Sequence, residues 1–349
     1  MHPGVSLTSD DTEDWHLPVV GPGVLLDVPT RGRWLQPPSL HLEAAPGYRL
    51  RLVWRGQPLL WARIAGYWDQ CVLVRGPADV RGALPLLTAP DVRAVGHEPG
   101  TPAWWEAWAR QWGRMLVDTS ESVLYTGRWC LRPVRAISAD QASRHAISTM
   151  EWSFGQPPMP PHSLDAVLRF RPAWVENWWE EIPDQKPGTV LPLRAPSDAE
   201  DGRIKSWRKR ARDGTLPPAL LLYVDLLGKW LVLDGHDRIH AALLEGREPP
   251  LMGLWPVVET RRPESRVREE GALIGAEIQL RAGATPEVID RVNRLLVRSF
   301  SSSGRGTVTR AWPVTGGINV WQAELRAWRK WNPTPLEADD WDWLVSDQD

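Results

Sequence analysis

One junction constrains this chain more than any other feature, because an apolar strand pattern runs directly into a helix pattern through a single glycine. Residues 231–242 read Leu-Val-Leu-Asp-Gly-His-Asp-Arg-Ile-His-Ala-Ala, and Gly235 separates the two patterns. Glycine permits the tight turn that such a junction needs, and the first free N–H groups of the helix then point to one place. Those groups and the permanently charged fork of Arg238 favour an anion there, such as phosphate or carboxylate.

Helix and strand patterns on both sides of the junction predict a small α/β unit. Ser197 and Glu200 form a capping-box pattern at the start of a basic helix, which Gly214 ends. The predicted order is helix, strand, strand, turn, helix and strand. The ranges are 197–212 for the first helix, 219–225 and 230–233 for the strands, 236–245 for the second helix and 251–258 for the last strand.

The stretch from about residue 189 to residue 258 resembles the ParB/sulfiredoxin-like superfamily, which carries an apolar strand, an Asp-Gly-His-X-Arg turn and a helix with paired alanines. The resemblance implies that the turn and the helix start bind nucleotide phosphates. Branches of that superfamily act as CTP-dependent DNA clamps, nucleases, ATP-dependent sulfinic acid reductases or a free-serine kinase. The matching residues are Asp234, Gly235, His236, Arg238, Ala241, Ala242 and Gly246.

Two residues of the turn differ from those of particular branches of the superfamily. His236 stands where sulfiredoxins have their cysteine, which excludes thiol chemistry at the turn. His236-Asp237 also replaces the glutamate and first arginine of the chromosome-partition branch. Asp237 stands beside the expected phosphate, and two like charges about 4 Å apart cost on the order of 4 kcal/mol at intermediate dielectric. Asp237 therefore helps to hold Mg²⁺, faces away from the pocket, or marks a site that has lost nucleotide binding.

These residues form the predicted site. Gly235, His236, Asp237 and Arg238 are the candidates for binding a nucleoside triphosphate. Arg238 would stabilise phosphate charge, and His236 is the candidate acid or base because its ordinary pKa lies near neutrality. Asp234 is the third catalytic candidate, and Asp234 and Asp237 are the candidate ligands for Mg²⁺. In the structural alternative, Asp234 caps the helix and Arg238 pairs with a surface acid.

The basic helix before the turn is the candidate contact for DNA. The chain has a net charge of −2, so no protein-wide field attracts nucleic acid. The helix is either a surface that contacts phosphates or a solvated face with salt bridges to Asp198, Glu200 and Asp201. The candidate contacts are Arg203, Lys205, Arg208, Lys209 and Arg212.

Composition predicts a cytoplasmic protein that does not enter a membrane. The chain has no run of about 18 apolar residues and no basic-then-apolar start. Cys71 and Cys130 lie far apart without CxxC spacing, which is typical of buried small hydrophobes. The chain has 23 Trp against 3 Phe and 4 Tyr, a skew expected of a GC-rich bacterial genome. The Trp104-Trp105-Trp108-Trp112 stripe predicts a packed helix face at 102–116.

The predicted fold class is α+β, with the ParB/sulfiredoxin-like α/β module at the centre. A β-rich α+β domain precedes it, and a C-terminal β-α-β-β unit follows, built from a strand at 272–280, a helix at 285–298 and a hairpin of 304–312 with 317–328. This unit is not a helix-turn-helix, which weakens a chromosome-partition role. The predicted boundaries are a disordered tail at 1–20, the N-terminal domain at 21–150, a Pro/Trp-rich helical link at 151–186, the module at 187–260, the C-terminal unit at 271–330 and an acidic tail at 331–349.

The leading hypothesis from the sequence is a nucleotide-binding, ParB-like protein that uses a CTP- or ATP-type nucleotide with Mg²⁺. Phosphotransferase, NTPase or nuclease activity would extend that role. The first alternative is a non-catalytic, ligand-responsive module that binds DNA or protein. The second is a structural interaction or immunity-type protein that has lost the activity. The expected partners are therefore a nucleotide, DNA through residues 203–212, and a protein.

Overall fold

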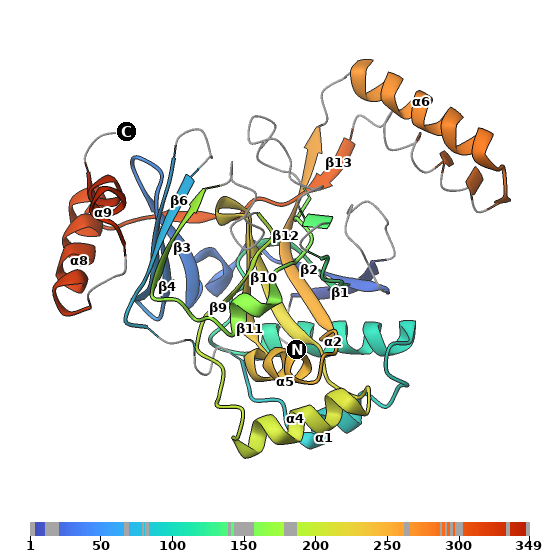
Figure 1. Ribbon diagram of the computed structural model, residues 1–349, viewed down its shortest axis with the longest axis horizontal. Coiled ribbons are helices and arrows are strands. Elements are labelled where there is room, and N and C mark those ends of the chain that lie inside the picture. Colours follow the sequence, from blue (N-terminus) through green and yellow to red (C-terminus); the bar gives the residue numbers. More distant parts are fainter. Residues whose placement is uncertain are drawn as a thin grey trace.

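The computed structural model has an α+β architecture in which two β-sheets lie next to each other and helices cover their ends and outer faces (Figure 1). Both sheets combine segments that are far apart in the sequence. The structure describes residues 4–10, 21–65, 70–78, 80, 84–138, 141–142, 157–177, 187–261, 266–286, 288–289, 292–293, 296, 303–332 and 336–346.

The larger sheet contains the predicted central module. Its strand order is β1-β2-β7-β12-β10-β11-β9, and β13 pairs with the far part of β12. The pairs β10–β12 and β11–β9 are parallel, and the other pairs are antiparallel. The strands are β1 (Ser6–Asp10), β2 (Gly23–Val28), β7 (Gly127–Val134), β9 (Val190–Pro192), β10 (Ala219–Val224), β11 (Lys229–Asp234), β12 (Leu251–Arg261) and β13 (Ser303–Gly306).

The smaller sheet has the order β14-β3-β4-β5-β6-β8. Its four middle strands form an antiparallel meander from one continuous stretch of chain, within the part that the sequence predicts to be β-rich. Both edge strands come from later segments. The strands are β3 (Leu40–Ala45), β4 (Arg49–Trp54), β5 (Gln57–Ile64), β6 (Gln70–Arg75), β8 (Ala173–Asn177) and β14 (Ala311–Pro313).

The helices fall into three groups in Figure 1. The first group, α1, α2, α4 and α5, lies at one end of the larger sheet. α8 and α9 lie beside the smaller sheet, and α6 extends away from the body. The helices are α1 (Ala89–Ala94), α2 (Pro102–Asp118), α4 (Gly202–Arg212), α5 (His236–Leu244), α6 (Arg266–Ala282), α8 (Gly317–Trp331) and α9 (Ala338–Val345), with short 3₁₀ turns η1 (Gly32–Leu35), η3 (Leu164–Val167) and η5 (Asp225–Leu227).

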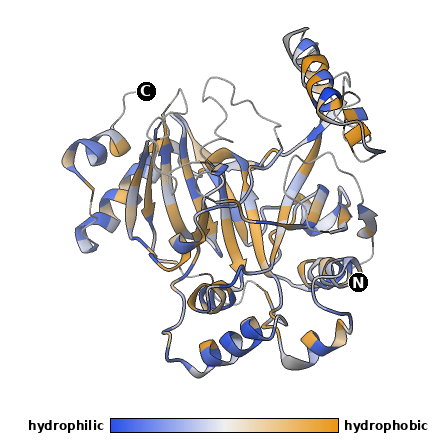
Figure 2. Cartoon of the chain, turned by 45° about the vertical axis from the view of Figure 1, so that its right-hand side comes forward, coloured by the Kyte–Doolittle hydropathy of each residue, from blue (hydrophilic) through white to orange (hydrophobic). Residues whose placement is uncertain are grey.

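Apolar side chains on the two faces of the larger sheet enter separate cores, as the hydrophobic strands in Figure 2 indicate. One face packs with α2 and the smaller sheet, and the four tryptophans predicted as a packed helix face are all buried there. The other face packs Trp230 and Trp255 near Ile239 of α5. Cys71 and Cys130 are buried and form no disulfide, as predicted.

Strands that the sequence assigns to different domains pair within one sheet. β12 of the predicted module forms antiparallel pairs with β7 from Leu251↔Val134 to Val257↔Arg128, and β7 pairs with β2. The sheet of the module therefore continues into the N-terminal part of the chain. Burial of both faces and continuous hydrogen bonding tie these segments together.

The C-terminal β-α-β-β prediction is wrong. The strand expected at 272–280 belongs to α6, where the buried residues Ala272 and Ala276 lie one helical turn apart. The hairpin strand expected at 317–328 is helix α8, whose Trp321 and Leu325 pack with Trp61 of β5. Their spacing of four residues suits a helix and not a strand. Most of the helix expected at 285–298 lies outside the described residues.

Two further predictions need correction, and the predicted acidic tail contains a helix. Residues 6–10 of the expected disordered tail form β1, which pairs with β2, whereas residues 11–20 lie outside the described part. The expected helical link contributes strand β8 to the smaller sheet, because Val175 and its neighbours pair with β6. The acidic tail contains α9, which docks on the body through Trp341 and Leu344.

Candidate functional site

The predicted turn joins β11 to α5, and its conformation requires glycine. Gly235 has φ +96°, in the left-handed region, and accepts the first helical hydrogen bond from the Ile239 N–H at 2.9 Å. A Cβ atom at this position would lie 2.6 Å from Cβ of Ala219 and 2.8 Å from Nη2 of Arg238. Any side chain at Gly235 would therefore push apart the turn and β10.

Arg238 is directed into the protein. Its Nη2 donates hydrogen bonds to Asp234 Oδ2 at 2.6 Å and to the Pro218 carbonyl at 3.2 Å, and only 3% of the residue is exposed. The guanidinium carbon also lies 5.8 Å from the ring centre of Trp112 and 5.7 Å from that of Trp207, within cation–π range. This charge is neutralised by Asp234 and enclosed by aromatic rings. Arg238 thus fastens α5 to β11, α2 and α4.

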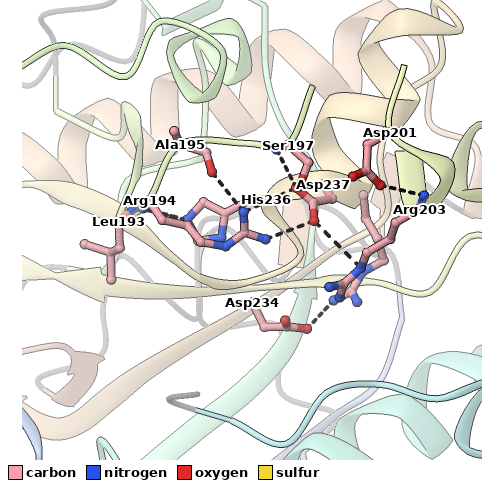
Figure 3. Close-up of polar contacts among 10 residues, drawn as sticks. Leu193, Arg194, Ala195, Ser197, Asp201, Arg203, Asp234, His236 and Asp237 are labelled. Carbon is pink, nitrogen blue, oxygen red and sulfur yellow. Dashed lines mark hydrogen bonds and ion pairs between the residues drawn. The ribbon is translucent and has the colours of Figure 1, made fainter. Parts of the chain in front are cut away.

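Asp237 holds the loop between β9 and α4 (Figure 3). Its carboxylate accepts hydrogen bonds from the Arg194 guanidinium at 3.3 and 3.0 Å and from the Ser197 N–H at 2.9 Å. Nε of Arg203 lies 3.8 Å away. Burial opposes ionisation of Asp237, but the hydrogen bonds from Arg194 and Ser197 outweigh burial and lower its pKa. The carboxylate is therefore ionised and fully partnered.

His236 binds the same loop as a neutral hydrogen-bond acceptor. Its Nε2 accepts hydrogen bonds from the backbone N–H groups of Leu193 at 3.0 Å and Arg194 at 3.3 Å (Figure 3). The proton of the neutral ring is therefore on Nδ1. Burial, followed by the positive charge of Arg194, lowers the pKa of His236 well below its ordinary value.

The structure thus brings the predicted site residues together, but it pairs them with one another and with residues 193–203. Of the two candidate Mg²⁺ ligands, Asp234 is bound to Arg238 and Asp237 to Arg194. No group of three His, Cys, Asp or Glu side chains suitable for a metal occurs within the described part of the chain. In this arrangement the turn clamps a loop, and it offers neither an accessible base nor a free arginine fork.

The basic helix α4 forms salt bridges with acids of its own module. Arg208 and Arg212 contact Glu245 at 2.5 and 2.8 Å, Lys205 contacts Glu200 at 2.9 Å, and Arg203 lies near Asp237. Lys209 is exposed. The helix also starts later than its predicted capping box, because Asp201 caps it by accepting from the Arg203 N–H while Ser197 bonds Asp237.

A cavity of about 400 Å³ lies at the other end of α5, where the sequence predicts no site. It is open on one side and falls within the size range of small-molecule sites. It brings together the start of α2, the end of α4, the end of α5 and the first residue of β12. The lining residues are Pro99, Gly100, Trp104, Trp105, Val134, Arg135, Ala211, Gly214, Leu216, Ala242, Arg247, Glu248, Pro249, Pro250 and Leu251.

The lining of this cavity is suited to binding and not to bond making. Tryptophan rings and prolines form apolar walls, and the Trp104 and Trp105 rings meet edge to face at 4.6 Å. The lining contains no Ser, Thr, Cys, His, Asp or Lys, and its single carboxylate, Glu248, pairs with Arg135 at 3.0 Å. The neighbouring Arg247 lies exposed at the rim without a carboxylate partner among the described residues. No periodicity in the sequence signals this assembly.

The buried, neutral state of His236 predicts a pH dependence. A histidine whose folded-state pKa is lowered contributes stability above the unfolded pKa of about 6.5, and this stability is lost as the pH falls below that value. We expect the stability advantage of the wild-type protein over His236→Gln to shrink by up to about 1.4 kcal/mol per pH unit below about pH 6.5. Urea unfolding of both proteins between pH 8 and pH 5 measures the difference.

The difference between the two proteins in free energy of unfolding, taken at each pH, removes the contribution of other titrating groups. Burial raises the pKa of Asp225 to about 7, so its ionisation lowers stability as the pH rises, with a slope of opposite sign. Asp225 is present in both proteins and cancels. A constant difference across this pH range would show that His236 is not held neutral by the fold.

The comparisons with known proteins do not place the chain in a family. No protein-family model matches it, and the searches of curated proteins and of solved structures find no match either. Among the described residues, no helix combines the length and the apolar character needed to cross a bilayer. The resemblance of residues 189–258 to the ParB/sulfiredoxin-like superfamily therefore stays a prediction.

Proposed function

We propose that this protein is a non-catalytic module that binds a small organic ligand in the cavity between α2, α4 and α5. The observation that carries the proposal is a ligand-sized space with apolar, aromatic walls and no nucleophile, acid or base free to react. The turn at the other end of α5 also supports a non-catalytic role. Its charged and polar side chains form hydrogen bonds within the protein.

The lining indicates the chemistry of the ligand. Trp104, Trp105 and Pro249 provide flat apolar surfaces that suit an aromatic or planar body. Arg247 provides a positive charge at the rim, which suits a negatively charged group on that body. We therefore propose a small aromatic acid as the ligand class. Nucleotide binding at Gly235 and His236 stays a separate prediction that the same experiments test.

Ligand binding in this cavity would act on the helices that enclose it. α4 contributes Ala211 to the lining, and its Arg208 and Arg212 form salt bridges with Glu245 at the end of α5. A ligand that contacts α2, α4 and α5 together stabilises their present arrangement, because it binds only the folded protein. The exposed surface of α4, which includes Lys209, is then the surface whose position depends on the ligand and which a partner can contact.

The aromatic anion anilinonaphthalene sulfonate is a suitable first probe, because it fluoresces in apolar sites. We expect the wild-type protein to bind it and to gain thermal stability, and Ala211→Leu to lose most of that binding because the larger side chain occupies part of the space in which the probe lies. Lys209→Gln, on the same helix but outside the lining, is the matched control and should bind as wild type does.

The same thermal-shift assay separates this role from the nucleotide role. CTP, ATP and GTP are each tested with and without Mg²⁺, and the reaction mixtures are analysed for hydrolysis. Nucleotide hydrolysis that survives in Ala211→Leu would contradict a non-catalytic module. Equal probe binding by wild type and Ala211→Leu would show that the cavity is not the ligand site.

A further inference from the structure

A second, smaller hollow lies where the two sheets meet, apart from the cavity between α2, α4 and α5. It has a volume of about 30 Å³ and is open to solvent on one side. Such a volume accommodates one small polar group or a water molecule. Arg75, the last residue of β6, forms part of its wall. The other lining residues are Ala166, Arg169, Arg171, Trp174, Leu191 and Pro192.

Arg75 is buried to about nine-tenths, yet it has no acidic partner among the described residues. Its Nε donates a hydrogen bond to the Arg171 carbonyl at 2.7 Å, and no hydrogen bond from either Nη atom is found in the described part of the chain. The guanidinium lies 3.9 Å from the ring centre of Phe170 and 5.4 Å from that of Trp174. The aromatic rings thus fix the plane of the Arg75 guanidinium, and the N–H groups of both Nη atoms remain available to a ligand.

Other buried cations of the molecule have a carboxylate or several oxygen acceptors. Lys229 pairs with Glu176, Arg132 with Asp10 and Arg238 with Asp234. Arg63, in the same sheet as Arg75, directs its guanidinium to the Trp343 carbonyl and the Ser346 hydroxyl of the C-terminal segment. Of these five residues, Arg75 is the one whose terminal nitrogens have neither a carboxylate nor a carbonyl acceptor in the described part of the chain, which leaves both Nη atoms available to a ligand.

Two further arginines, Arg169 and Arg171, also line the hollow. Arg169 pairs with Asp165 at 2.7 Å. Arg75 contributes to lowering the pKa of His236, which lies at the N-terminus of α5. Burial lowers the pKa of Arg75 itself to about 9, so the guanidinium stays charged at neutral pH. The hollow is therefore lined by three arginines and, among the described residues, by no carboxylate.

We propose that this hollow binds an oxyanion group, either a carboxylate or a phosphate, through the two Nη donors of Arg75. The planar fork of an arginine matches two oxygens of such a group, and the rings of Phe170 and Trp174 keep that fork in place. Leu191 and Pro192 form the apolar side of the hollow, immediately before the loop that His236 and Asp237 hold. An anion here also stabilises the contact between the two sheets.

The test measures the midpoint of thermal unfolding of the full chain in sodium phosphate, sodium acetate and sodium chloride at one ionic strength. We expect phosphate or acetate to raise the midpoint above the chloride value, and the more effective anion identifies the ligand group. In Arg75→Gln this increment should vanish, with an apparent dissociation constant roughly ten- to a hundredfold weaker, as for the loss of hydrogen bonds to a charged group.

Arg63→Gln is the matched control, because it removes another buried guanidinium of the same sheet. It should unfold at a lower temperature in all three salts and still keep the anion-dependent increment. Arg75→Lys retains the charge without the fork and should keep a reduced increment, which tests the site even where Arg75→Gln folds poorly. The proposal is overturned if wild type shows no increment, or if Arg75→Gln and Arg75→Lys keep it in full.

Discussion

Replacement of Arg238 with alanine is expected to lower the free energy of unfolding by about 3 kcal/mol, because it leaves the Asp234 carboxylate and the Pro218 carbonyl without their donor. It also removes a cation enclosed by the rings of Trp112 and Trp207. Urea unfolding followed by tryptophan fluorescence measures the change. The variant should therefore be less stable than wild type even in the absence of a ligand.

A double-mutant cycle with Asp234 separates the ion pair from the rest of the effect. Arg238→Ala with Asp234→Ala should be more stable than the sum of the single variants predicts, because the second substitution removes the uncompensated carboxylate. The binding of anilinonaphthalene sulfonate to folded Asp234→Ala should match wild type. A fully stable Arg238→Ala protein that fails only to bind a nucleotide would contradict the structural role and support the phosphate-binding role instead.

The strands and helix around the turn could be predicted because their signals are local. β10, β11, α5 and β12 follow the predicted ranges to within a few residues, and Gly235 adopts the positive φ that a tight junction needs. Alternation, turn residues and the glycine all lie within one short window of sequence. The helical stripe of tryptophans in α2 was predictable for the same reason.

The roles of His236 and Asp237 could not be predicted, because their partners are distant in the sequence. Asp237 contacts Arg194 and Ser197, and His236 contacts the backbone of Leu193, all forty or more residues earlier in the chain. A pattern that places a histidine and an arginine at the start of a helix does not reveal whether another segment covers them. The sequence predicts a strand where helix α8 forms, because the Gly-Gly start of this helix resembles a hairpin turn.

α5 links the two ends of this region. At its N-terminus, His236, Asp237 and Arg238 fix the loop before α4 and the neighbouring strand. At its C-terminal end, Ala242 lines the cavity, together with Glu248 from the loop that follows. A helix of nine residues spans about 13 Å, so a ligand at one end does not touch the turn at the other. The contacts of the turn fix the positions of α4 and α5, and both helices line the cavity.

The buried ion pair between the two sheets should give the largest effect of any single substitution. Lys229 of β11 and Glu176 of β8 are both fully buried, with Nζ and Oε2 2.7 Å apart, and the Trp174 indole N–H donates to the other oxygen of Glu176 at 3.0 Å. Lys229→Met or Glu176→Leu should each lower the free energy of unfolding by about 3–5 kcal/mol, because each leaves one buried charge without its partner.

The double variant Lys229→Met/Glu176→Leu distinguishes the charge effect from the loss of packing. It removes both charges and replaces them with apolar groups, so it should recover most of the stability lost in either single variant. Urea unfolding of the wild type, both single variants and the double variant completes the cycle. Additive losses would show that the two residues act independently. Recovery in the double variant would show that the pair specifies how the sheets meet at little net cost in stability.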